Sequence, residues 1–359
     1  MGGWSRVGVV LLSPLWVGCG SGGKDTGFGL ETTSALPVLP EAEELYGTYC
    51  GFCHGEQGEG YVADNANALA NPHFLASASD DFIRAGIVHG RPGTPMPAWG
   101  LDYGGPLVDA HVEAILSLIR SWETMDPVAL TEGTIEGDPE RGAVVYGAQC
   151  AACHGETGEG AVAVSLNNPW FLHTASDGFI EYAIKEGRPG TSMPGFEGVL
   201  SVEEIEDLVA LLRSWEVEVD DTPMPEFVPD WTDAIIQEGG PPASFEPEGL
   251  YVSADEVHQA IEDGKSLVIA DARPPSDYLF GHISGAVSVP FYDAELAADQ
   301  LPDDLWVLTY CGCPHAISTQ AAESLMEAGR TQVGVIDEGY YYWVDQGYPV
   351  SRGRERYEE

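Results

Sequence analysis

Hydrophobic residues recur at helical spacing in two corresponding stretches of the first 217 residues. They fall at positions i, i+3, i+4 and i+7 within residues 108–122 and 202–215, which predicts an amphipathic helix in each stretch. The apolar residues of the two faces are Val112, Ile115, Leu116, Ile119, Ile205, Leu208, Val209 and Leu212. We expect each of these helices to pack within a helical domain.

From Leu250 onward, short apolar runs alternate with helical patterns. The runs SLVIADAR, WVLTY and VGVID predict strands, whereas SADEVHQAIEDG, with Ser253 as its cap, and STQAAESLMEAG predict helices. This alternation predicts an α/β domain with a parallel sheet at residues 250–352, with the working loops at the carboxyl ends of the strands. Residues 218–249 are rich in Pro, Asp, Glu and Gly and are predicted to be a linker, from which Phe227 and Trp231 could pack on a neighbour.

The first 18 residues have the pattern of an export signal. Arg6 is the only charge before an apolar run that is too short to span a bilayer. The run ends in LWVGCG, which resembles a bacterial lipoprotein signal with Cys19 as the lipidated residue, although Trp16 replaces the usual aliphatic residue. The alternative is an ordinary cleaved signal that removes Cys19. We expect an extracytoplasmic, periplasmic chain that is held to the membrane by a lipid anchor only, with residues 19–40 as a flexible linker.

The helical half is a tandem duplication. YGTYCGFCHGEQGEG begins at Tyr46 and YGAQCAACHGETGEG at Tyr146, and NPHFLASASDDFI, GRPGTPMP and LSLIRSWE each recur downstream in the second copy. Each copy contains Cys-x-x-Cys-His, the attachment signature of c-type haem. The residues are Cys50, Cys53 and His54 in the first copy and Cys150, Cys153 and His154 in the second. Two cysteines can bond to the porphyrin vinyl groups while the histidine reaches the iron.

A sixth iron ligand is expected in the repeated GRPGTxMP loops. Met96 and Met193 occupy the same place in the two copies, and His/Met ligation is typical of electron-carrying cytochromes c. His89 is the competing ligand in the first copy, but its counterpart is Glu186. His73 corresponds to Trp170 and fails for the same reason. The two copies resemble class I cytochromes c over residues 41–124 and 137–217, which implies two all-α domains and two covalently bound haem c groups.

The stretch YCGCPHAIST places Cys311 and Cys313 at the end of the predicted strand WVLTY. The spacing does not fit a haem anchor, and a zinc site would need more ligands. The flanking sequences DARPPSDYLFGHISGAVSVP and IDEGYYYWVDQGYPV resemble rhodanese domains. That resemblance implies that Cys311 is the catalytic thiol, in a cradle of backbone N–H groups at a helix N-terminus that lowers its pKa. Cys313 is then an auxiliary or resolving thiol.

The loop departs from the commoner family pattern, because Pro314 removes one N–H donor and no Arg is present. Two hypotheses therefore remain. In the first, the chain is a dihaem electron carrier coupled to inorganic sulfur or persulfide chemistry, as a sulfurtransferase or a sulfur-oxidising oxidoreductase. In the second, it is a plain electron relay whose rhodanese-like domain is a catalytically silent docking module.

The charge of the chain limits its partners. With 15 Lys and Arg against 58 Asp and Glu, the formal net charge is -43, which repels nucleic acid and attracts basic proteins. We therefore expect basic redox partner proteins. Among inorganic sulfur donors, neutral hydrogen sulfide fits this field better than anionic thiosulfate.

Overall fold

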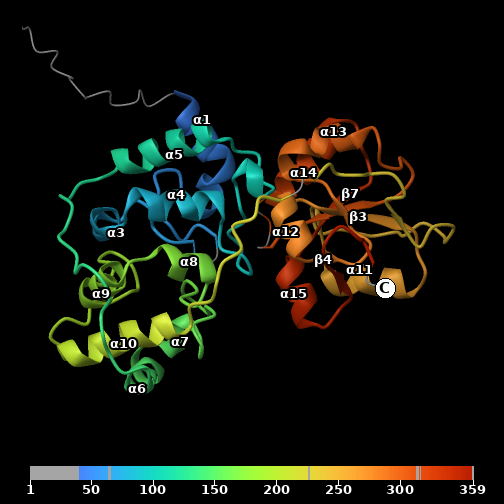
Figure 1. The fold of residues 1–359 in the computed structure, drawn as a ribbon. Coiled ribbons are helices and arrows are strands. Elements are labelled where there is room, and N and C mark those ends of the chain that lie inside the picture. The colour runs from blue at the N-terminus through green and yellow to red at the C-terminus, as the bar shows by residue number, and fades with distance from the viewer. Residues whose placement is uncertain (1–39, 64–65, 225–226, 313–314, 316, 358–359) are drawn as a thin grey trace, which may run out of the picture. The chain divides into compact units, whose positions relative to one another are not determined.

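The computed structural model describes residues 40–63, 66–224, 227–312, 315 and 317–357. The predictions for the signal, for Cys19 and for Cys313 lie outside these residues. The predicted fold class is confirmed, because helical units are followed by an α/β unit with a mostly parallel sheet (Figure 1). Residues 38–359 group into one compact unit. No helix in the described ranges is both long and apolar enough to cross a membrane.

Each of the two helical units contains five α-helices in the part of the chain that the structure describes. The first contains α1 (Pro40–Tyr49), α2 (Gly51–His54), α3 (Pro72–Ser77), α4 (Asp80–Val88) and α5 (Asp109–Ser121). The second contains α6 (Pro139–Gln149), α7 (Ala151–His154), α8 (Pro169–Thr174), α9 (Asp177–Glu186) and α10 (Val202–Ser214). A 3-10 turn, η1 (Leu101–Tyr103), precedes α5. The predicted amphipathic helices are α5 and α10, and all eight predicted face residues are buried.

The helix ends follow the repeated sequence. Asn71 and Ser79 cap α3 and α4, and Asn168 and Ser176 cap α8 and α9, each through a side-chain oxygen that accepts a backbone N–H. Pro follows each capping Asn, where its missing N–H costs nothing. The last helix of each unit packs on the first, α5 on α1 and α10 on α6.

The C-terminal sheet has the order β1-β3-β6-β7-β2, with β5 also paired to β3. Its strands are β1 (Ile235–Ile236), β2 (Tyr251–Val252), β3 (Leu267–Asp271), β5 (Val287–Ser288), β6 (Val307–Tyr310) and β7 (Val333–Ile336). Every pairing is parallel except that of β1 with β3. A separate antiparallel pair joins β4 (His282–Ile283) to β8 (Val350–Ser351).

Helices cover both faces of this sheet (Figure 1). They are α11 (Ala254–Glu262), α12 (Pro275–Phe280), α13 (Ala294–Ala298), α14 (Ile317–Glu327) and α15 (Gly339–Asp345), with a 3-10 turn η2 (Phe291–Asp293). Along β3, Val268 and Ala270 belong to one apolar cluster, whereas Leu267 and Ile269 belong to another. Side chains alternate between the two faces of a strand, so both faces of β3 are apolar, as a covered parallel strand requires.

The segment predicted as a linker contributes to the sheet. Ile235 and Ile236 form the edge strand β1, which pairs with Val268 and Leu267. Two residues are too few to show a period of two, so the strand leaves no hydrophobic pattern in the sequence. The expected aromatic contacts are also present: the Trp231 indole donates to the Ser288 carbonyl at 2.7 Å, and the Phe227 ring lies 5.8 Å from that of Tyr278.

Candidate functional site

The short helices α2 and α7 hold the two Cys-x-x-Cys-His motifs in the same conformation. The first cysteine caps the helix and the histidine is its last residue. His54 and His154 are buried, as is Cys50. Cys53 and Cys150 are half-buried, whereas Cys153 is exposed. The helical turn brings both cysteines and the histidine of each motif together, as the sequence predicts.

Each histidine is held in one tautomer by the loop that follows it. The Nδ1 atom of His54 lies 2.9 Å from the Asn67 carbonyl oxygen, and that of His154 lies 2.8 Å from the Val164 carbonyl oxygen. A carbonyl can only accept, so Nδ1 carries the proton and Nε2 keeps its lone pair. Burial lowers the pKa of both rings, which favours the neutral form. This is the state that a metal-ligating histidine needs.

The thiols do not have the properties of a redox-active pair. Burial raises the pKa of the Cys50 thiol to about 12 and that of Cys150 to about 11. A thiol–disulfide catalyst needs the opposite, because the thiolate is the reactive form. The raised pKa of these two thiols therefore argues against thiol–disulfide exchange at Cys50 and Cys150.

The two predicted methionine ligands sit in loops with matching hydrogen bonds. In the first unit, the Arg91 N–H donates to the Met96 carbonyl at 2.8 Å, and the Thr94 hydroxyl bonds to the Arg91 carbonyl at 2.7 Å. The corresponding bonds in the second unit join Arg188 to Met193 at 3.0 Å and Thr191 to Arg188 at 2.7 Å. The loops therefore present Met96 and Met193 in the same way.

A glycine closes the base of each loop. Gly90 has φ +60, and a Cβ there would lie 2.2 Å from the Pro97 carbonyl oxygen. Gly187 has φ +67, and a Cβ there would lie 2.4 Å from the Pro194 carbonyl carbon. Only glycine combines this left-handed backbone with so close an approach. The repeated Gly of GRPGTxMP is thus required by the loop that carries the methionine.

The arginine of each loop is a cation without a carboxylate. Arg91 lies 5.4 Å above the Phe82 ring and donates to the Gly90 carbonyl, and Arg188 repeats this with Phe179 at 5.3 Å and Gly187. Neither makes an ion pair within the described part of the chain. Burial lowers the pKa of both guanidinium groups to about 10. Sequence reasoning did not single these arginines out, although the repeat contains both.

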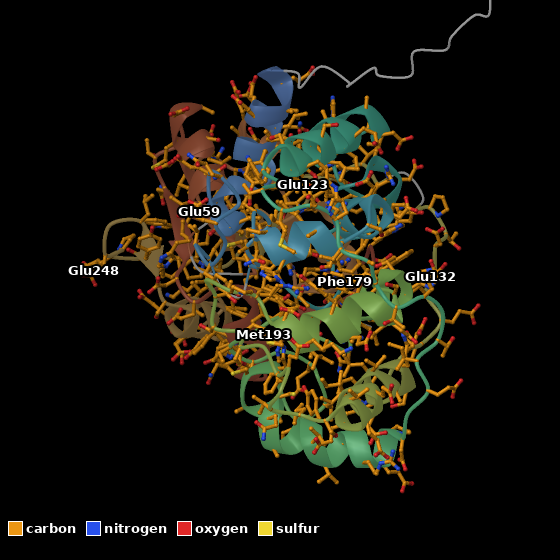
Figure 2. All side chains as sticks on the ribbon, turned by 90° about the vertical axis from the view of Figure 1, so that its left-hand side faces the viewer. Glu59, Glu123, Glu132, Phe179, Met193 and Glu248 are labelled. Carbon is orange, nitrogen blue, oxygen red and sulfur yellow. The ribbon has the colours of Figure 1, made fainter. Side chains whose placement is uncertain are left out.

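Figure 2 labels two side chains of the second unit. Phe179 is the aromatic residue beneath Arg188, and Met193 is the predicted iron ligand. The figure also labels Glu132 and Glu248, which are exposed. Acidic side chains such as these give the chain its net charge of -43.

The competing histidines have other partners. The His89 ring is stacked on that of Trp170, with 3.5 Å between centroids, and His73 Nδ1 lies 2.9 Å from the Tyr182 hydroxyl. Both contacts are made with the second cytochrome unit.

Cys311 follows β6 directly and lies beside the start of α14. Its side chain is 1% exposed, and its Sγ atom lies 3.2 Å from the Ser318 Oγ, on the first turn of α14. Strand, thiol and helix N-terminus thus occur in the expected order. The Ser318 hydroxyl is a contact that the sequence did not predict, because it comes from a helix that begins six residues later.

Two charged groups near this strand end are already paired. The Arg273 guanidinium is buried and makes two bonds to Asp271, at 2.9 and 2.6 Å, and the Tyr310 hydroxyl donates to the same carboxylate. Burial raises the pKa of nearby Asp277 to about 7. On the thiol loop, His315 is hydrogen-bonded to Asp337. Arg273 is therefore committed to its own aspartate and not available to an anionic substrate.

Aromatic rings join the thiol domain to the first attachment motif. Phe291 lies 6.1 Å from Phe52, the second residue between the attachment cysteines, and 6.0 Å from Tyr49 (centroid distances). Trp99, three residues after Met96, lies 6.5 Å from Phe291. The described part of the second motif has no such aromatic residues.

Together, the fold and these motifs define a tandem c-type cytochrome joined to a rhodanese-like domain. Two family models match the chain accordingly. The model for the cbb3-type cytochrome c oxidase subunit III matches residues 37–117 and 137–212, and the rhodanese-like domain model matches residues 253–346. The C-terminal domain belongs to the rhodanese-like family, and the two helical units are similar to the cytochrome c domains of that oxidase subunit.

Curated relatives fall into the same two groups. The chain is 27% identical over 183 residues to the cbb3-type cytochrome c oxidase subunit CcoP of Azospirillum sp., covering 46% of this chain and 58% of that protein. It is 26% identical over 99 residues to a sulfurtransferase of Allochromatium vinosum, covering 28% of this chain and 92% of that protein. It is 33% identical over 82 residues to the thiosulfate sulfurtransferase GlpE of Pseudoalteromonas translucida, covering 23% and 76%. The chain spans little more than half the length of the oxidase subunits that it matches.

Proposed function

We propose that the chain is a dihaem electron carrier that oxidises sulfide at Cys311. Cys50 and Cys53 would hold one haem with His54 and Met96 as iron ligands. Cys150, Cys153, His154 and Met193 would do the same for the second. The matched histidine tautomers and methionine loops support this set, because both units present the same donors.

The unpaired arginines fit the same cofactor. A haem carries two propionate groups, which need cations when they are partly buried. Arg91 and Arg188 are half-buried, unpaired in the described part of the chain, and placed beside the predicted methionine ligands. By contrast Arg120 and Arg213, also repeated, are already paired with Asp80 and Asp177. Arg91 and Arg188 would therefore neutralise the propionates.

The reaction at Cys311 removes two electrons. A sulfur–sulfur bond forms between the Cys311 thiol and hydrogen sulfide. The thiol loses its proton, hydrogen sulfide loses one of its two protons, and a pair of electrons leaves, so that a persulfide remains on Cys311. When bound, each haem would supply a one-electron acceptor, so the two together take the pair. The protons leave to solvent, and His315, on the same loop, is hydrogen-bonded to Asp337.

The residues around Cys311 favour a small neutral donor. The thiol is 1% exposed, and Arg273 is bound to Asp271. A thiosulfate dianion would meet a buried thiol and, in Arg273, a cation that is already paired, and the net charge of -43 repels it. Hydrogen sulfide carries no charge and is close to water in size. Ser318 Oγ, with the start of α14, would stabilise the thiolate that forms when Cys311 loses its proton.

One observation carries the coupling of thiol and haem. Cys311 follows β6 and Phe291 follows β5, and both strands pair with β3. Backbone bonds run from the Phe291 N–H to the Ala272 carbonyl and from the Ala272 N–H to the Tyr310 carbonyl. Two strand spacings separate them by roughly 10 Å. Phe291 in turn contacts Phe52, between the first attachment cysteines. Electron tunnelling falls steeply with distance, so this is a short route.

Mass spectrometry after anaerobic exposure to sulfide tests the thiol assignment. Cys311→Ser should lose the persulfide, whereas Cys313→Ser, the auxiliary thiol, should keep it. A persulfide that survives in Cys311→Ser overturns the assignment. The alternative is a plain electron relay with a silent docking domain, which the burial of Cys311 and the pairing of Arg273 with Asp271 favour. This alternative predicts no persulfide in the wild type or in either variant.

The proposed location is outside the cytoplasm, with Cys19 as a lipid anchor. Cys19→Ser should move the protein from the membrane fraction into the soluble fraction. A wild-type protein that is already soluble would contradict the anchor. The proposed partners are basic redox proteins, because the surface is acidic.

A further inference from the structure

The contact between the two cytochrome units follows the symmetry of the sequence repeat. Phe82 and Phe179 are equivalent residues, and their rings face each other at 4.8 Å. Phe74 contacts Phe179 at 6.3 Å, and its equivalent Phe171 contacts Phe82 at 5.9 Å. Equivalent residues exchange partners, so the contact is close to a two-fold, self-complementary one.

Two equivalent asparagines make the polar part of this contact. The Asn71 Nδ2 donates to the Pro189 carbonyl at 2.9 Å, and the Asn168 Nδ2 donates to the Pro92 carbonyl at 3.0 Å. Both side chains are more than nine-tenths buried. Pro92 and Pro189 belong to the GRPGTxMP loops. Each asparagine therefore binds the loop that carries the predicted methionine ligand of the other unit.

The capping role of these residues does not explain the second bond. The Asn71 Oδ1 accepts from the Phe74 N–H at 3.1 Å, and the Asn168 Oδ1 accepts from the Phe171 N–H at 3.2 Å. Ser or Asp would cap a helix equally well, but neither offers an amide donor beside the oxygen. Only asparagine caps its own helix and holds the opposite loop at once.

We infer that Asn71 and Asn168 are positioning residues for the iron-ligand loop of the opposite unit. This inference rests on the proposed ligation by Met96 and Met193. The prolines of each loop lack the N–H groups that would form hydrogen bonds within the loop. The asparagine bond to the loop carbonyl therefore restrains the loop from outside. The ligand geometry of each haem, and with it the reduction potential, thus depends on the neighbouring unit. A change in one unit should be detected at the haem of the other.

The test uses the full-length dihaem protein in two backgrounds. Met96→His and Met193→His each leave one His/Met haem, whose near-infrared sulfur-to-iron band and midpoint potential then report on one unit. Asn71→Ser retains the capping oxygen and removes the amide group that donates to the Pro189 carbonyl. It should weaken the Met193 band and lower the potential of that haem, because methionine ligation raises it. It should leave the Met96 band unchanged, and Asn168→Ser should give the reverse pattern.

The outcomes separate this inference from the ligand assignment. If neither His background removes its share of the band, the methionines are misassigned. If both do, but Asn71→Ser alters only the Met96 haem, both haems equally, or neither, the cross-unit role is wrong. Asn71→Asp is the second variant, because it also keeps the cap oxygen and lacks the donor. It should perturb the same haem as Asn71→Ser.

Discussion

The two cytochrome units have nearly the same interior and different surroundings. Tyr46 and Tyr146 both donate to the glycine carbonyl after the attachment histidine, and Trp122 and Trp215 both pack against that tyrosine ring. Beside the attachment cysteines the units diverge. The first has Tyr49 and Phe52, half-buried against the thiol domain, whereas the second has Gln149 and Ala152, both exposed.

This difference predicts separate roles for the two proposed haems. The bonds that set the histidine tautomer and hold the methionine loop are equivalent, so neither feature gives a reason for one haem site to differ from the other. The surroundings of the two attachment motifs, by contrast, differ. The first attachment face is covered by the thiol domain, and the second is open. We therefore expect electrons to enter through the first unit and to leave through the second.

The largest effect should come from the predicted ligands themselves. Met96→Ala and Met193→Ala should each abolish about half of the near-infrared sulfur-to-iron band, because each removes one thioether from one iron. The measurement is absorption of the oxidised protein. An unchanged band in both variants would show that the ligands are others.

The covered face of the first unit can be opened by Phe291→Ala. We expect much slower haem reduction by sulfide, since the ring contacts Phe52, and a loss of about 3–5 kcal/mol of unfolding free energy, since the side chain is buried. The matched control is Phe245→Ala, a buried phenylalanine of the same domain that packs on Trp306. Equal slowing by both variants would mean that lost stability, not the contact, is responsible.

The second unit has an ion pair that the first lacks. Asp207 is buried and accepts two bonds from Arg141, at 2.7 and 2.8 Å, where the repeat places Ala114 and Glu41 in the first unit. Hydrogen bonding by Arg141 lowers the Asp207 pKa below its ordinary 3.8. This stabilisation is present above the ordinary pKa and is lost as the pH falls through the lowered one.

Asp207→Asn should therefore destabilise the second unit by about 1–3 kcal/mol at neutral pH. The difference from the wild type should shrink in strong acid. Thermal unfolding, followed at the haem bands at pH 7 and at low pH, measures both. A deficit that does not change with pH would argue against the ion pair as its cause.

The smallest effect concerns the open face of the second unit. Glu156→Lys should lower the association rate with a lysine-rich cytochrome c several-fold at low salt, and added salt should remove the difference. The equivalent Glu56→Lys in the first unit is the control and should have less effect. Equal effects would mean that partners do not distinguish the units.

Much of the fold can be predicted from local sequence patterns, but the contacts that distinguish the two units cannot. The faces of α5 and α10 follow from helical periodicity, and the strands β3, β6 and β7 follow from short apolar runs between helical patterns. The repeat and the Cys-x-x-Cys-His spacing suffice to propose the haem residues. By contrast, β1 is too short to leave a pattern, and it forms because β3 offers an unpaired edge.

The long-range partners could not be derived from the sequence. Asn71 could be identified as a helix cap, since Pro follows it, but its bond to Pro189 joins residues 118 positions apart. His89 and His73 could be rejected as ligands from the repeat, yet their partners Trp170 and Tyr182 depend on how the units meet. Likewise, the attachment motif contains Phe52, but the sequence does not show that its ring contacts Phe291.

We propose that two electrons pass from sulfide and Cys311 to the haems, through the first unit. An anaerobic titration with sulfide, following haem reduction and Cys311 persulfide in the same samples, tests it most directly. The account predicts two haems reduced for each persulfide formed, and loss of both signals in Cys311→Ser. Haem reduction at the wild-type rate in Cys311→Ser, or persulfide without haem reduction, would contradict it.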